Sequence, residues 1–170
     1  MHWKRFARVL LLILLAAPAL LGMRAQTPTH SRAQPPEARM THHAAGTFEV
    51  KMAPLGAGPA EGLMRISMDK QFHGSLEASG KGEMISGGDP KAGAAGYVAM
   101  ELVTGRLDGR SGSFALQHSA TMDASGQKML ITVVPGSSTE ELKGMAGTFQ
   151  IVIADGKHSY TFDYSLPAAE

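Results

Sequence analysis

The sequence predicts an all-β fold: a single antiparallel eight-stranded β-barrel, preceded by a cleavable signal peptide and a flexible tether. Apolar side chains repeat with a period of two in most segments after residue 40, which is typical of strands with one buried face. Glycine-rich turn signals separate these segments, and no window has the spacing of an amphipathic helix of ordinary length. The 170 residues include no cysteine, which excludes a disulfide scaffold and any cysteine-based metal or redox site.

The first 25 residues have the order of an export signal. A basic segment precedes an apolar run: Lys4, Arg5 and Arg8 stand before residues 9–21. This run is too short to span, as a helix, the roughly 30 Å of bilayer hydrocarbon. We therefore expect cleavage after Ala25, or otherwise after Ala19, and a periplasmic or secreted protein with no stable membrane insertion once the leader is removed. An uncleaved anchor, or a shorter protein that starts at Met40, are the alternatives.

Residues 26–40 are polar and proline-rich, and this composition predicts a flexible tether. Residues 1–40 hold six of the sixteen basic residues but one of the fifteen acidic ones, so residues 41–170 carry ten basic and fourteen acidic groups, a formal charge of −4. This balance argues against a nucleic-acid partner. The domain at 41–170 is long enough to bury a single core, because a chain of this size buries roughly two-thirds of its unfolded surface.

Eight strands are expected in this domain. Three of them show the alternation most clearly: 63–72 (Met64, Ile66, Met68 and Phe72 on one face), 111–122 (Phe114, Leu116, His118, Ala120 and Met122) and 160–166 (Tyr160, Phe162, Tyr164 and Leu166). The others are expected at 47–53, 75–85, 97–107, 128–134 and 148–154. His118 shares the bulkier, more apolar face of its strand with Phe114 and Leu116, and we take this face to be the inner one.

The connections between strands are short and rich in turn residues. Turns are expected at 87–90, 108–109, 125–126 and 155–156, and residues 138–144 have the cap and acidic residues of one or two helical turns. Successive hairpins predict an antiparallel meander, and eight such strands close readily into a barrel that is filled by side chains or holds one small ligand. Glycines inside strands, such as Gly80, Gly82 and Gly105, fit the coiling that closure needs. A two-sheet sandwich is the alternative.

Three stretches of the sequence resemble the bacterial "domain of unknown function 3224" family. They are residues 72–84 (FHGSLEASGKGEM), 97–118 (YVAMELVTGRLDGRSGSFALQH, the most specific) and 133–147 followed by 155–164. The resemblance covers residues 42–166 and implies a small barrel similar to that of allene oxide cyclase. It implies no activity, because the function of the family is not established. Members usually have no leader, so the expected export signal is a departure.

Five residues are candidates for a ligand-binding site. Glu101 lies inside the most apolar strand, His118 ends an apolar face, His73 follows a buried aromatic residue, and Tyr97 and Tyr160 supply hydroxyl groups. A carboxylate, an imidazole and phenols that converge in the mouth of a barrel can orient a ligand or transfer protons.

We expect no metal and no cofactor. His42 and His43 are adjacent near a flexible terminus, an arrangement that more often binds nothing specific. The methionines of the domain invite a copper site, but Met64 and Met68 fall in step with core residues, so packing explains them better.

Two hypotheses of function follow. The first is a non-catalytic barrel that binds a small apolar molecule or serves as a structural module, and it is the one we favour. The alternative is a cyclase- or isomerase-like enzyme in which Glu101 or His118 acts as acid or base in the lumen, and close convergence of these side chains would favour it. The oligomeric state is left open by the sequence.

Overall fold

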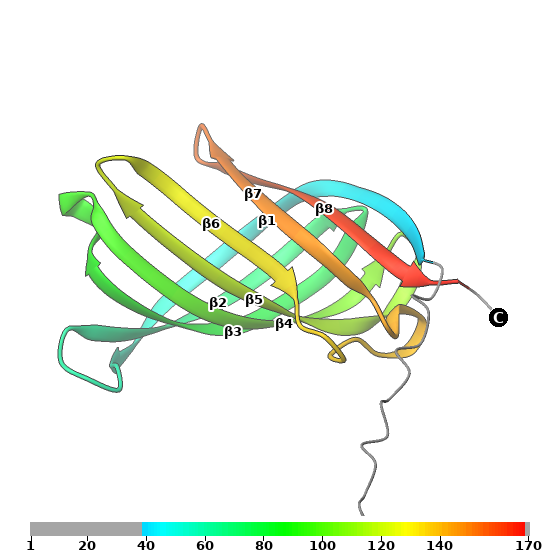
Figure 1. Cartoon of the computed structure of the whole chain (residues 1–170), viewed down its shortest axis with the longest axis horizontal. Helices are drawn as coiled ribbons and strands as arrows, with labels where there is room; N and C mark the ends of the chain where they lie inside the picture. The colour runs from blue at the N-terminus through cyan, green and yellow to red at the C-terminus, as the bar shows by residue number, and fades with distance from the viewer. Residues whose placement is uncertain (1–38, 169–170) are drawn as a thin grey trace, which may run out of the picture. The chain divides into compact units, whose positions relative to one another are not determined.

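The computed structural model describes residues 39–168, which form one closed antiparallel barrel in which every strand pairs with its neighbours in sequence (Figure 1). The predicted all-β class and eight-stranded barrel are confirmed, and the sandwich alternative is not adopted. The predicted signal peptide and residues 26–38 of the predicted tether lie outside the described residues. In residues 39–168 we find no helix with the length and apolar character needed to cross a membrane.

All eight predicted strands are present, and most are longer than the alternation indicated. Their bounds are β1 Arg39–Ala57, β2 Leu63–Gly74, β3 Leu76–Asp89, β4 Ala94–Leu107, β5 Arg110–Asp123, β6 Gly126–Val133, β7 Ala146–Ala154 and β8 Lys157–Pro167. Because β1 begins at Arg39, the last two residues of the expected tether belong to the first strand. Strand β1 pairs with β8 from Arg39↔Pro167 to Phe48↔His158, and this pairing closes the barrel.

The turns predicted at 108–109 and 155–156 are confirmed, because backbone geometry demands those residues. The turn predicted at 125–126 lies at 124–125, and the one predicted at 87–90 begins only at Pro90, because β3 continues to Asp89. The β4–β5 and β7–β8 connections are two-residue loops in which both residues have positive φ: 48° and 82° at Asp108 and Gly109, and 51° and 71° at Asp155 and Gly156. An Asp-Gly pair tolerates this conformation, whose twist matches that of the flanking strands. The predicted helical turns reduce to one 3-10 turn, Glu140–Leu142, within the β6–β7 connection.

One end of the barrel is filled by an aromatic core. Its buried rings come from five strands, β1, β2, β5, β7 and β8: Phe48, Phe72, Phe114, Phe149, Tyr160, Phe162 and Tyr164. The β6–β7 connection contributes Leu142 and Met145 to the same cluster. The hydroxyl groups of the buried tyrosines are hydrogen-bonded: the Tyr160 hydroxyl accepts from the backbone N–H of Leu76 at 2.9 Å, and the Tyr164 hydroxyl donates to Asp108 Oδ2 at 2.7 Å. This end is therefore a packed core and not a pore.

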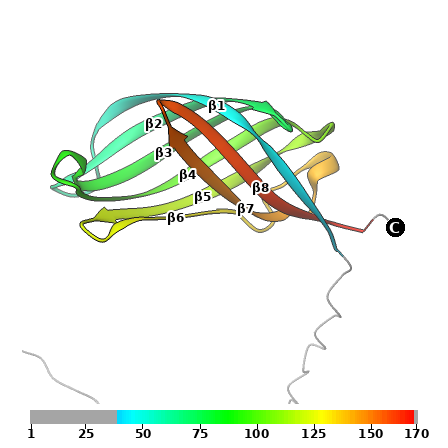
Figure 2. The ribbon, with the colours of Figure 1, turned by 90° about the horizontal axis from the view of Figure 1, so that it is seen from above.

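At the other end the wall of the barrel is incomplete. The β6–β7 ladder has two residue pairs, Ile131↔Phe149 and Thr132↔Thr148, and the two strands diverge toward their hairpin tips (Figures 1 and 2). Within the described chain, residues 49–57 of β1, 126–130 of β6 and 150–154 of β7 each lack a ladder partner on one side. The open end is thus bounded mainly by the continuous sheet from β1 to β6.

Candidate functional site

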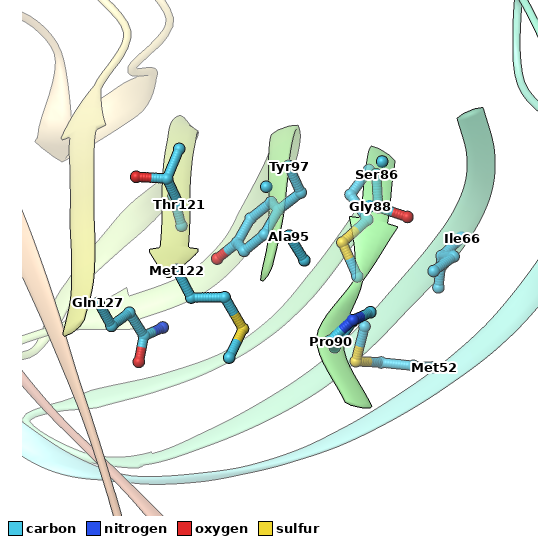
Figure 3. Close-up of a pocket in the computed structure, with 14 residues that line it drawn as sticks. Met52, Ile66, Ser86, Gly88, Pro90, Ala95, Tyr97, Thr121, Met122 and Gln127 are labelled. Atoms are coloured by element: carbon cyan, nitrogen blue, oxygen red, sulfur yellow. The ribbon is translucent and has the colours of Figure 1, made fainter. Parts of the chain in front are cut away.

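A cavity of about 350 Å³ lies at the open end of the barrel (Figure 3). Its lining is mostly apolar, with thioethers from Met52, Met84 and Met122, and its polar side chains are those of Ser86, Tyr97, Thr121 and Gln127. The 14 lining residues include no charged side chain. Strands β1 to β6 all contribute, because each turns alternate side chains toward the concave face of the sheet.

A buried polar cluster lies deeper in the barrel. The Lys70 Nζ donates to Glu101 Oε2 at 2.7 Å, and His118 Nε2 lies 3.1 Å from the same oxygen. The three side chains come from β2, β4 and β5 and are 5%, 0% and 2% exposed. The His118 contact is bent: the two atoms are close, but the ring nitrogen makes no well-directed hydrogen bond.

The Glu101 carboxylate is held in its charged form. Burial would by itself raise the pKa of Glu101, but the contact with His118 and the positive charge of Lys70 outweigh burial and leave the pKa below its usual value. Space for the carboxylate comes from two glycines of β3, because a Cβ at Gly80 would collide with Glu101 Oε1 and one at Gly82 would lie 2.9 Å from Glu101 Cα. Oε1 itself is buried without a hydrogen-bond partner in the described structure.

One layer of side chains separates the cluster from the cavity. Met68, Met84 and Ala99 form a small buried group, and Met84 also lines the cavity. Along the strands, Ala99 precedes Glu101 by two positions on the same face, and neither Lys70, Glu101 nor His118 is among the cavity-lining residues. Tyr97 links the two regions electrostatically: burial, followed by the negative charge of Glu101, raises the pKa of its hydroxyl, which therefore stays a proton donor at neutral pH.

The five candidate residues are distributed over three places. Glu101 and His118 meet in the buried cluster, which confirms the inward face assigned to His118, and Tyr97 lines the cavity. His73 lies on the outer face of β2, where its Nε2 is 3.1 Å from Glu49 Oε2. Tyr160 belongs to the aromatic core at the closed end. The five therefore do not form one site.

The histidines near the start of β1 have other partners. The His42 ring stacks on Tyr164 with centroids 4.9 Å apart, and His43 Nδ1 lies 2.6 Å from Asp163 Oδ1. Over residues 39–168, no group of three or more His, Asp or Glu side chains is arranged to hold a metal ion.

The comparisons with known proteins concern the whole barrel. The family model described as "Protein of unknown function (DUF3224)" matches residues 44–164, which is more than two-thirds of the chain. The chain belongs to the DUF3224 family. The barrel is similar to the crystal structure of a DUF3224 protein of unknown function from Shewanella oneidensis MR-1, with 41% sequence identity and a TM-score of 0.71. That match covers 76% of this chain and 100% of the other. No match to a curated protein was found.

In the buried cluster of this DUF3224 barrel, the residue that sequence reasoning missed is Lys70. Its side chain lies on the same face of β2 as those of Met68 and Phe72, which point inward, and this alternation was enough to place Lys70 inside the barrel. Its charge argued the other way, since lysine is almost never fully buried unless it is paired. The partner, Glu101, lies 31 positions later in the sequence, and the alternation of one strand cannot show it.

Proposed function

We propose that this DUF3224 barrel binds a small, predominantly apolar molecule in the cavity at its open end. The observation that carries the proposal is the cavity itself: about 350 Å³ lined chiefly by apolar side chains, at the end where the wall is incomplete. Ligand pockets ordinarily measure about 300–1,000 Å³ and combine an apolar lining with a few polar groups. The volume lies within this range, toward its lower end, so the expected ligand is compact.

The lining also indicates the chemistry of the ligand. Three methionines supply flexible, polarizable walls that adapt to ligand shape, and the Tyr97 hydroxyl and Gln127 amide supply hydrogen bonds. A charged ligand would be desolvated without an opposite charge on the lining, which is costly. The ligand we expect is therefore uncharged, with an apolar body and one or two hydrogen-bonding groups.

The leader supports a second element of the proposal, the place where binding occurs. A basic segment followed by an apolar run is read by secretion machinery, so we propose that the barrel binds its ligand in the periplasm or outside the cell.

A fluorescent apolar probe, N-phenyl-1-naphthylamine, tests binding to the full chain. Ala120 lines the cavity and is 6% exposed, so Ala120→Phe fills part of the volume and should weaken probe binding by about tenfold, which is about 1.4 kcal/mol. Ser119→Phe adds the same ring to the adjacent, exposed position on the outer face and should leave binding unchanged. Absence of probe binding by the wild type, or equal binding by the two variants, would contradict the proposal.

The enzymatic alternative has one observation in its favour, the convergence of Glu101 and His118 at 3.1 Å. A substrate would reach these groups only by displacing the layer that contains Met84. The molecule that copurifies with the wild type, compared by chromatography with that from His118→Asn, separates the two functions. A binding protein retains the same compound in both, whereas an isomerase retains different isomers.

A further inference from the structure

Strand β7 has a free edge with an unusual composition. Residues 150–154 (Gln-Ile-Val-Ile-Ala) pair with β8 on one side and, within the described residues, with nothing on the β6 side. The segment contains no charge, proline or glycine, and Val152 and Ile153 are 57% and 62% exposed. Proteins ordinarily protect a free strand edge with a charged residue, a proline or a bulge. The β7 edge has none of these.

The other two free edges at the open end do carry such protection. Lys128 lies in the middle of the unpaired part of β6. In the unpaired part of β1, Lys51 supplies a charge, and Pro54 precedes an irregularity in the ladder with β2. The β6 and β1 edges thus carry a lysine or a proline and the β7 edge carries neither, which indicates that another strand covers the β7 edge.

We propose that β7 pairs antiparallel with β7 of a second copy of this chain. Antiparallel pairing of a strand with its own copy is twofold symmetric, and the three residues Ile151-Val152-Ile153 read the same in both directions. Val152 then faces Val152 of the partner subunit, and Ile151 faces Ile153 of the partner subunit. β-branched residues in direct cross-strand pairs are favourable, and no charge opposes a like charge. The same pairing centred on Lys128 of β6 would oppose two lysines.

The shape of the open end leaves room for this partner. The tip of the β7–β8 hairpin stands apart from the tip of the β5–β6 hairpin in both views, so at this end β6 does not reach the free edge of β7 (Figures 1 and 2). The inference is independent of the proposed ligand, because the pairing uses main-chain groups of β7, and none of the β7 residues lines the cavity.

Single-cysteine variants of the full chain test the pairing, since the natural sequence has no cysteine. Residues directly opposite across an antiparallel pair have Cα atoms about 4.5–5.5 Å apart, which a disulfide spans. Val152→Cys should therefore form a covalent dimer under mild oxidation. Val98→Cys is the matched control: Val98 is 56% exposed but lies on the outer face of β4, which is paired on both sides. We expect it to cross-link at least about tenfold more slowly, because its partner distance exceeds disulfide reach.

Sedimentation velocity provides the second measurement. The wild type should sediment as a dimer, Val152→Lys should raise the dissociation constant by about tenfold or more because two lysines then oppose each other, and Val98→Lys should not change it. A wild type that stays monomeric over the whole concentration range overturns the proposal, as does equal cross-linking of the two cysteine variants. Faster cross-linking of Ile153→Cys than of Val152→Cys overturns the register.

Discussion

Replacing Glu101 by glutamine should destabilise the barrel strongly. Glutamine has the size of glutamate, so the change creates no cavity, but it leaves the buried Lys70 ammonium without its anionic partner at 2.7 Å. Removing one member of a buried ion pair costs about 3–5 kcal/mol. The rings of Phe48 and Phe72, whose centroids lie 5.2 and 5.7 Å from Lys70 Nζ, retain part of the stabilisation of the charge. We therefore expect a loss near the lower limit, about 3 kcal/mol, out of a total of about 5–15 kcal/mol for a domain.

Urea unfolding followed by circular dichroism measures this loss. With a slope of about 1–3 kcal/mol per molar urea, the midpoint should fall by about 1–3 M without a change in slope. Adding Lys70→Met to Glu101→Gln should recover stability, since the unpaired charge is then gone. Glu83→Gln is the matched control: it breaks the exposed ion pair with Arg65, which contributes little to stability, and should leave the urea midpoint nearly unchanged. If Glu101→Gln costs no more than Glu83→Gln, the reasoning is wrong.

Three further predictions concern acid stability, packing and export. Folding lowers the pKa of Glu101 from its ordinary value of 4.5, so the contribution of Glu101 to stability is present above pH 4.5 and is lost as the pH falls through the folded-state pKa. Below pH 4.5 the wild type should therefore lose more unfolding free energy than Glu101→Gln. Parallel pH profiles of the two proteins would contradict this. Gly80→Ala should lower the free energy of unfolding, measured in urea, by about 1–3 kcal/mol, because the methyl group takes the space of Glu101 Oε1. An unchanged free energy of unfolding would refute the tight packing. Intact-mass analysis of the extracytoplasmic fraction should find an N-terminus near Gln26, whereas a cytosolic chain that begins at Met1 or Met40 would exclude export.

The fold was predictable because each strand carries its own signal. Alternation placed Phe114, Leu116 and His118 on the inner face, and Asp-Gly pairs placed two hairpin turns. The extra length of β1 was not predictable, because Arg39–Thr41 are exposed and carry no alternation, and only the ladder with β8 shows that they are strand. Pairing between distant strands is a tertiary property that the pattern of one segment does not contain.

The candidate site was predictable in part, for a related reason. Alternation with Phe114 and Leu116 placed His118 inside, and the structure adds that Glu101 lies inside as well, on the adjacent strand, and meets it. His73 was misleading, because it follows a buried phenylalanine and therefore points to the opposite face, toward Glu49. The cavity was beyond reach, since it depends on where the β6–β7 and β1–β8 ladders stop, and those end points come from strand divergence and hairpin length.

The pairing of β1 with β8 sets an order on the folding of the chain. Residues 39–48 pair with residues 158–167, and residues 39–45 have no partner on β2, so the start of the first strand can pair only after the last strand has been made. Contacts of such high sequence separation are slow to form, because the whole intervening chain must be brought back to close the loop. During synthesis the hairpins from β2 to β6 can assemble one after another, but the barrel cannot close until the C-terminus has been released. A chain that is threaded N-terminus first through a membrane channel would therefore remain without its closing seam throughout the passage, and the barrel would complete itself only on the far side.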